Sequence, residues 1–228
     1  MTRSLLMVLT SHSQLGNTGQ QTGSWLEELA APYCTFVDAG FAVELASIAG
    51  GIAPIDPVSR EGAWITAAGK RFLADAEAMQ ALRRTRPIAS ATDAGYSALF
   101  LVGGTGAAWD FMGNPYLKAL AEGLERRNAV LAAVCHGVLG LTDLTAADGQ
   151  RLLKGRRATG ISNREEELFG LTTVVPVLPE ERLRKAGAFY LAAAPLEANV
   201  VGDGNLYTGQ NPASARPLAE AVVRRIAA

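Results

Sequence analysis

Short apolar runs alternate along this chain with longer segments in which apolar residues recur at helical spacing. A continuous run such as VLAAV is typical of a strand buried on both faces of a parallel sheet, whereas WLEEL places its apolar residues on one face of a helix. The predicted strands are 4–9, 41–46, 98–102 and 130–134. The predicted helices are 22–39, 64–81, 115–126, a helix directly after residue 134, and 212–226. Pro32 is expected to kink or end the first part of the helix at 22–39. The stretch 152–179 is less regular.

The order of these elements predicts the fold class. Strands that alternate with helices form a parallel sheet with helices on both faces, so we expect an α/β architecture. No repeat, low-complexity segment or linker interrupts the pattern, and residues 1–228 are therefore expected to form a single domain. In such a sheet, ligands bind beyond the carboxyl ends of the strands, so the candidate site should lie there.

Composition and charge narrow the class of partner. The chain has 228 residues, of which 49% are hydrophobic and 19% charged, and its formal net charge is −1. This balance offers no electrostatic footprint for nucleic acid or for an anionic membrane. The apolar run near the start is too short to span a bilayer and no signal-peptide cleavage site follows it, so we expect a cytoplasmic protein. Two cysteines do not make a disulfide framework.

One cysteine and one histidine, Cys135 and His136, stand side by side where a predicted buried strand meets a predicted helix. Backbone N–H groups and the helix dipole at that position favour a thiolate, and a strand–Cys–helix turn resembles a nucleophile elbow. A free cysteine in an apolar run is equally typical of a core residue. The titratable side chain of His136 directly after a buried strand favours the functional interpretation. Cys34, on an apolar helix face, is expected to be buried and unreactive.

Few other residues can complete a site with this thiol. No histidine follows His136, and the other one, His12, lies in a predicted loop where solvent exposure is expected. No CxxC or HExxH motif and no zinc-type carboxylate spacing is present, so we expect no metal.

Two glycine-rich stretches follow predicted strands. LGNTGQQTG and VGGTGAAW mark tight turns; in the second, Trp109 stands where a dinucleotide fingerprint has its last glycine. Neither stretch has the GK[ST] of a phosphate-binding loop. Backbone N–H groups of the glycine pair Gly103–Gly104 beside the cysteine instead suggest an oxyanion hole.

Four motifs in order resemble the DJ-1/PfpI superfamily over nearly the whole chain. They are TGSWLEELAAPY with DAGFAVELASIAGGIAPIDP, VGG followed by AAVCHG, TGISNREEELFGL, and DGNLYTGQNPAS. The chain is most similar to the heat-shock chaperone-like branch, which includes glutathione-independent glyoxalases. The resemblance implies a flavodoxin-like sandwich, a catalytic set of Cys135, His136 and Glu28, and substrate or oxyanion contacts at Gly103, Gly104 and Thr105. Glu27, about a hundred degrees around the helix from Glu28, is expected to face solvent.

The function that the resemblance implies is the cofactor-free conversion of small 2-oxoaldehydes, such as methylglyoxal to lactate, by a homodimeric lyase in carbonyl-stress defence. One residue departs from the pattern: glyoxalases of this branch often carry GGHG where this chain has GGTG, so Thr105 replaces a histidine. Two alternatives stay open. One is a PfpI-type cysteine hydrolase or amidase, and the other is a stress chaperone or oxidation sensor without turnover.

Overall fold

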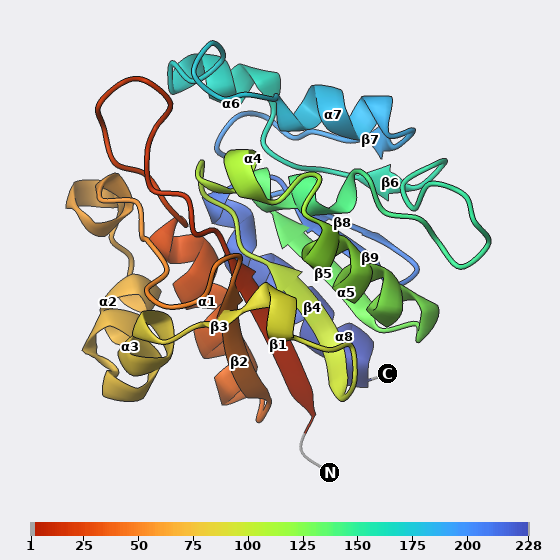
Figure 1. Cartoon of the computed structure of the whole chain (residues 1–228). Coiled ribbons are helices and arrows are strands. Elements are labelled where there is room, and N and C mark those ends of the chain that lie inside the picture. The colour runs from red at the N-terminus through yellow and green to blue at the C-terminus, as the bar shows by residue number, and fades with distance from the viewer. Residues whose placement is uncertain (1–2, 228) are drawn as a thin grey trace.

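The computed structural model describes residues 3–227. Its centre is a seven-stranded sheet in the order β3-β2-β1-β4-β5-β9-β8, in which every neighbouring pair is parallel except β8–β9 (Figure 1). The strands are β1 (Ser4–Leu9), β2 (Ala42–Ser47), β3 (Arg86–Pro87), β4 (Tyr96–Leu101), β5 (Val130–Val134), β8 (Val200–Asp203) and β9 (Leu206–Gly209). A two-stranded parallel sheet pairs β6 (Arg157–Ala158) with β7 (Phe189–Tyr190).

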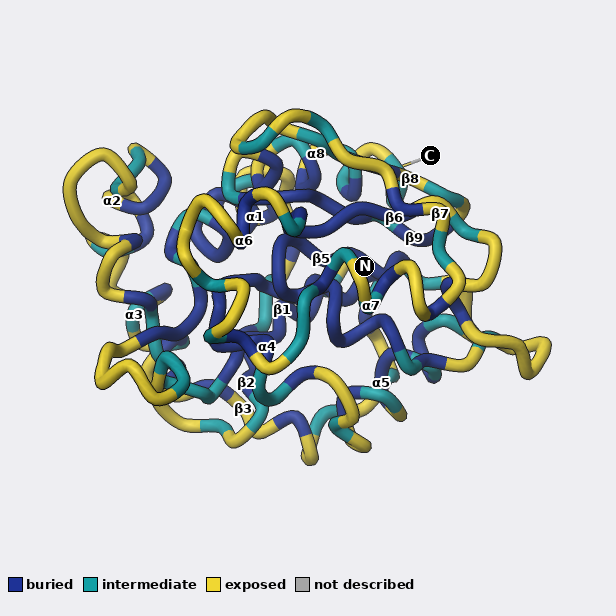
Figure 2. The backbone as a smooth tube through the Cα atoms, turned by 90° about the horizontal axis from the view of Figure 1, so that it is seen from above, coloured by how far each residue is buried: buried dark blue, intermediate teal, exposed yellow. Residues whose placement is uncertain are grey.

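Helices cover both faces of the central sheet because alternate strand residues point to opposite sides. In β1, Leu5 and Met7 pack against α1, α2, α3 and α8, whereas Leu6 and Val8 pack against α4, α5 and α7. The tube in Figure 2 is accordingly buried at the strands and exposed mainly at the periphery. The helices are α1 (Leu26–Asp38), α2 (Ala67–Ala74), α3 (Ala76–Arg83), α4 (Ala107–Asp110), α5 (Pro115–Arg126), α6 (Asn163–Leu168), α7 (Pro179–Lys185) and α8 (Ala215–Ala227).

The predicted α/β class and the flavodoxin-like sheet are confirmed. The four predicted strands correspond to β1, β2, β4 and β5, and the segment 115–126 is helical as expected. The two strands β8 and β9 were not predicted, because each has four residues and carries little periodic signal. No helix within residues 3–227 combines the length and apolarity needed to cross a membrane.

Three helix predictions need correction. The first helix begins at Leu26 rather than at residue 22, and it does not end at Pro32 but continues to Asp38. The segment 64–81 forms two helices, because the side chain of Asp75 accepts hydrogen bonds from the N–H groups of Glu77 and Ala78 and thereby starts α3. The helix after β5 is a 3₁₀ segment, Cys135–Leu141, rather than an α-helix.

Candidate active site

Cys135 lies on a strained turn directly after β5. Its φ of 55° is in the left-handed region, which costs a non-glycine residue about 1–3 kcal/mol and persists where the surroundings enforce it. Gly137 allows the turn to pack against β4, since a Cβ there would lie 2.5 Å from the carbonyl oxygen of Leu101. The backbone thus has the geometry of a nucleophile elbow, although the thiol is only 4% exposed.

Glu28 reaches the same point from the first turn of α1. The start of this helix is fixed by two hydrogen bonds, from the N–H of Trp25 to the carbonyl of Gly103 (3.1 Å) and from the N–H of Leu26 to Oγ of Ser59 (3.0 Å). Gly103 makes the approach possible, because a Cβ there would lie 2.2 Å from Oε2 of Glu28 and 2.9 Å from the Cβ of Cys135. Because Gly103 has no side chain, the Glu28 carboxyl and the Cys135 side chain can both lie against it.

The environment of Glu28 favours its protonated form. The side chain is fully buried, and within residues 3–227 neither carboxyl oxygen has a partner in hydrogen-bonding geometry. Burial, with a smaller contribution from the nearby carboxylates of Glu165 and Glu27, raises the pKa of Glu28 to about 8, although the Cys135 side chain and the Gly104 N–H partly offset these effects. At neutral pH this group is mostly a neutral acid beside the sulfur.

The environment of Cys135 does not match the expectation of a thiolate stabilised by a helix dipole. Burial raises the pKa of the Cys135 thiol well above its ordinary value, and the negative charges of Glu28, Glu166 and Glu165 act in the same direction. The His136 N–H lowers it only in part. The helix that begins here is a short 3₁₀ segment surrounded by carboxylates, so its dipole does not dominate. The resting site therefore holds a thiol and needs a proton acceptor.

His136 lies between the thiol and a second acid. Its Nδ1 is 3.4 Å from Sγ of Cys135, and its Nε2 is 2.8 Å from Oε1 of Glu166 on α6. A carboxylate at Glu166 accepts a hydrogen bond from Nε2–H, which leaves Nδ1 as an acceptor facing the thiol. Both side chains are at most 1% exposed. Glu166 was not predicted, because nothing in the motif NREEELFGL distinguishes it from the acids on either side.

The neighbouring acid, Glu165, has a different environment. Its carboxylate accepts five hydrogen bonds at 2.7–3.0 Å, which join α6 to the loop before β8 and to the segment after β9. Although burial raises the pKa of Glu165, these hydrogen bonds outweigh burial and lower it overall. The donors are Ser162 (backbone and hydroxyl), Leu196, Gln210 and Asn211.

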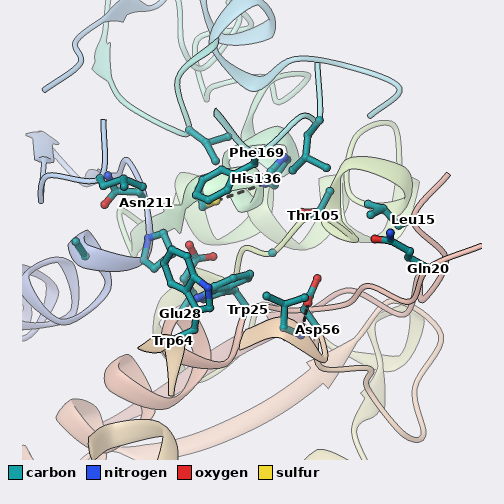
Figure 3. A pocket seen from close by; sticks show the side chains of 18 residues that line it. Leu15, Gln20, Trp25, Glu28, Asp56, Trp64, Thr105, His136, Phe169 and Asn211 are labelled. Carbon is teal, nitrogen blue, oxygen red and sulfur yellow. Dashed lines mark hydrogen bonds between the residues drawn. The ribbon is translucent and has the colours of Figure 1, made fainter. Parts of the chain in front are cut away.

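A cavity of about 280 Å³ opens above the thiol (Figure 3). Of the predicted residues, Glu28, Gly104, Thr105, Cys135 and His136 line it, whereas Gly103 does not. The N–H groups of Gly104 and His136 lie close enough to Glu28 and to the sulfur, respectively, to lower the pKa of each group. The remaining lining is Leu15, Gln20, Trp25, Asp56, Val58, Trp64, Ile161, Phe169, Leu171, Leu196, Asn211, Pro212 and Ala213.

Three other residues singled out from the sequence lie outside the cavity. His12 is half-buried rather than freely exposed, since its ring stacks on Trp109 at 4.7 Å and Nε2 lies 2.6 Å from the carbonyl oxygen of Gln14. Glu27 is also half-buried and accepts a hydrogen bond from the hydroxyl of Thr66, so the expectation of a solvated acid was wrong. Cys34 is buried as predicted, and burial raises the pKa of its thiol.

Fold and site together define an α/β protein with a buried cysteine at a nucleophile elbow, flanked by a histidine and acids from two different helices. The model of the DJ-1/PfpI family matches residues 22–225, and the chain belongs to this family.

Relatives and solved structures agree with this assignment. The chain is 28% identical to the glutathione-independent glyoxalase hsp3101 of Schizosaccharomyces pombe, with 96% of this chain and 94% of the relative covered. Glyoxalase III of Candida albicans superposes with a TM-score of 0.91 at 26% identity, with 97% and 96% covered. The Rapid Encystment Protein 24 KDa of Francisella tularensis superposes with a TM-score of 0.94 at 35% identity, with 99% of each chain covered.

Proposed function

We propose that this protein is a glutathione-independent glyoxalase, a lyase that converts methylglyoxal and related 2-oxoaldehydes to 2-hydroxy acids by means of Cys135, His136 and Glu28. The observation that carries the proposal is the fully buried carboxyl of Glu28, which has no hydrogen-bonding partner among residues 3–227 and lines a small cavity together with Cys135. Its pKa of about 8 suits a group that takes a proton from carbon and returns it near neutral pH. The names of the similar proteins support the same reaction.

The first step adds the thiol to the aldehyde. His136 Nδ1 accepts the Sγ proton of Cys135 while sulfur attacks the aldehyde carbon, and that proton passes to the aldehyde oxygen to complete a hemithioacetal. Glu166 stabilises the imidazolium that forms between these two events. We assign the stabilisation of the developing negative oxygen to the N–H groups of Gly104 and His136, which lie next to Glu28 and the sulfur.

The second step moves a proton between neighbouring carbons. Glu28, in its carboxylate form, removes the proton from the hemithioacetal carbon to give an enediolate, and then delivers it to the adjacent carbon. The hydroxyl proton on the first carbon moves to the oxygen on the second, so that the first carbon becomes the thioester carbonyl. The product is a 2-hydroxyacyl thioester of Cys135. Water then attacks the thioester, the thiol is released with one proton from that water, and the 2-hydroxy acid leaves. The overall reaction consumes one aldehyde and one water and needs no cofactor.

The cavity favours this reaction over peptide hydrolysis. A volume of about 280 Å³ lies at the lower end of small-molecule pockets, and it accommodates a small carbonyl compound rather than an extended peptide. We further propose that the protein is a cytoplasmic homodimer that acts in carbonyl-stress defence. A stress chaperone without turnover is the remaining alternative. Removal of the Cys135 thiol distinguishes the two functions, because chaperone activity should persist without the thiol whereas glyoxalase turnover should not.

Methylglyoxal consumption without glutathione, with lactate identified as product, tests the proposal. We expect turnover in the wild type and none above background in Cys135→Ala, with Cys34→Ala as the matched cysteine control. Because the carboxylate form of Glu28 is the active one, kcat/KM should rise with pH and level off above about 8. Absence of lactate, or equal turnover in Cys135→Ala, would contradict the proposal. Protection of client proteins that persists in Cys135→Ala would then favour the chaperone.

A further inference from the structure

The rim of the cavity gathers apolar side chains that are exposed to solvent. Trp64 is 38% exposed and Phe169 40%, and two further rim residues, Val58 and Leu196, are 56% and 48% exposed. These four are a large share of the exposed large apolar side chains within residues 3–227, and they all surround one opening. Contiguous exposed apolar surface around a concave site is typical of a binding surface for an apolar group.

Aromatic rings from three distant segments form one side of this rim. Trp25 precedes α1, Trp64 ends the short segment Gly62–Trp64, and Phe169 follows α6. The ring of Trp64 packs edge-on against Trp25, with centroids 5.4 Å apart, and against Phe169 at 6.1 Å. In Figure 3 these rings lie near Glu28 and His136, while Leu15 and Gln20 lie on the other side. A planar apolar group entering the cavity would therefore meet ring faces and edges next to the reacting groups.

The cavity also lacks a counter-charge for an anion. Among the described residues that line it, none is a lysine or arginine, whereas two are acids, Glu28 and Asp56. Two more buried acids are close to the cavity: Glu166 pairs with His136, and Glu165 precedes it on α6. A carboxylate or phosphate on the substrate would lose hydration here without gaining a cationic partner.

We propose that the cavity selects uncharged 2-oxoaldehydes with a bulky apolar, preferably aromatic, substituent, and that Trp64 and Phe169 set this preference. The inference rests on the proposed glyoxalase function and specifies its substrate class. The cavity volume is about 280 Å³. The methyl group of methylglyoxal leaves much of this space hydrated, whereas a phenyl ring displaces that water and packs against the rings.

Turnover of phenylglyoxal and of methylglyoxal provides the first test, with the rate in Cys135→Ser subtracted because phenylglyoxal also reacts with arginines. We expect kcat/KM for phenylglyoxal to exceed that for methylglyoxal by roughly tenfold or more. Trp64→Ala and Phe169→Ala should each reduce this ratio several-fold, and Trp64→Phe should keep most of it. Phe189→Ala, an exposed aromatic that does not line the cavity, is the matched control and should leave the ratio unchanged.

Two analogues of phenylglyoxal that lack the aldehyde group test the charge preference. Phenylglyoxylate and 1-phenylpropane-1,2-dione share the phenyl ketone, and they differ in carrying a carboxylate or an uncharged acetyl group. The dione should protect Cys135 from iodoacetamide at a concentration at least tenfold below that needed for phenylglyoxylate. Trp64→Ala should weaken the protection by the dione. Equal protection by the two compounds would overturn the preference for uncharged ligands.

The outcomes separate this inference from the proposed function. Methylglyoxal turnover without a phenylglyoxal preference would overturn the inference and leave the glyoxalase proposal standing. Protection by the dione that depends on Trp64, in a protein that turns over neither aldehyde, would support the aromatic binding site and reject the glyoxalase. If Trp64→Ala changes the oligomeric mass and not the substrate ratio, the rim is a subunit contact and the inference is wrong.

Discussion

Two acids in this protein are both inaccessible to solvent, and yet their pKa values shift in opposite directions. Glu28 on α1 and Glu165 on α6 are both 0% exposed. Glu28 has no hydrogen-bonding partner within residues 3–227 and its pKa is raised to about 8, whereas Glu165 accepts five hydrogen bonds and its pKa is lowered. Burial alone therefore does not decide the charge of a carboxyl; the donors that the fold directs at it do. The neutral acid, Glu28, lies next to the thiol, whereas the charged acid, Glu165, links α6 to neighbouring segments through its hydrogen bonds.

The largest effect should come from removing the proton-transfer capacity of the unpartnered acid. Glu28→Gln keeps the size of the side chain but cannot exchange a proton with carbon, so kcat should fall by roughly a hundredfold or more. Circular dichroism should show an unchanged fold. Steady-state kinetics with methylglyoxal, with Glu27→Gln in parallel, checks this. Near-normal activity in Glu28→Gln together with a loss in Glu27→Gln would assign the chemistry to the other acid.

The partnered acid should instead matter for stability. In Glu165→Gln the amide NH₂ group faces donors that had paired with the carboxylate, and at least two of them lose their acceptor. The free energy of unfolding should drop by about 2–4 kcal/mol, measured by urea denaturation. Glu167→Gln, on the same helix with a side chain that is 54% exposed, is the control and should change stability by less than about 0.5 kcal/mol. Equal effects of the two substitutions would show that the five hydrogen bonds do not stabilise the fold.

The two acids should also give opposite pH dependence of stability. The folded-state pKa of Glu28 is above its ordinary value of 4.5, so the folded protein retains a proton that the unfolded chain loses. Its contribution to stability is present below pH 4.5 and is lost as pH rises towards 8, with a slope of up to about 1.4 kcal/mol per pH unit. For Glu165 the contribution is present above pH 4.5 and is lost as pH falls through its lowered value.

Denaturation across this pH range measures both slopes. Glu28→Gln should become progressively more stable than the wild type between pH 4.5 and 8, because it lacks the group that must lose its proton. Glu165→Gln should approach the wild type as pH falls. A constant difference between Glu28→Gln and the wild type over this range would mean that Glu28 ionises in the folded protein as it does in water.

Glu166 has fewer hydrogen-bonding partners than Glu165 but more than Glu28, and its substitution should reduce turnover less than Glu28→Gln does. One of its oxygens pairs with His136, and the other, within the described part of the chain, has no partner. Glu166→Gln retains an oxygen that accepts from Nε2–H but no longer stabilises an imidazolium, so kcat should fall roughly tenfold. The rate of iodoacetamide labelling of Cys135 should fall in parallel, since the same histidine takes the thiol proton. Unchanged labelling would remove His136 from that role.

The smallest effect should come from adding a titratable group opposite Glu28. Thr105 is 8% exposed, lines the cavity, and follows the glycine whose N–H acts on Glu28. Thr105→His places a second proton acceptor there and should raise methylglyoxal turnover by roughly two- to fivefold. Since the backbone N–H is kept, iodoacetamide labelling should stay the same. Lower turnover with unchanged labelling would indicate that Thr105 fits another substrate.

The sequence by itself determined most of the sheet and the position of the nucleophile. The continuous apolar run of β5 is a local feature that its residues alone specify, and it ends at the Cys135–His136 pair that the structure places at the elbow. The motif resemblance pointed to Glu28, which the structure brings to the thiol. The four-residue strands β8 and β9 were missed, because so short a run has no periodicity that distinguishes it from a loop.

Only the tertiary structure decided which acids are charged and what surrounds the thiol. Glu166 reaches His136 from 30 residues away, and nothing local distinguishes it from Glu165 or Glu167. The sequence suggested a thiolate held by a helix dipole, but desolvation and nearby carboxylates raise the thiol pKa instead. The aromatic rim joins three segments that are separate in the chain. Local patterns reflect the period of a helix or strand, whereas desolvation and hydrogen bonding depend on which distant groups pack together, and that is fixed only when the chain has folded.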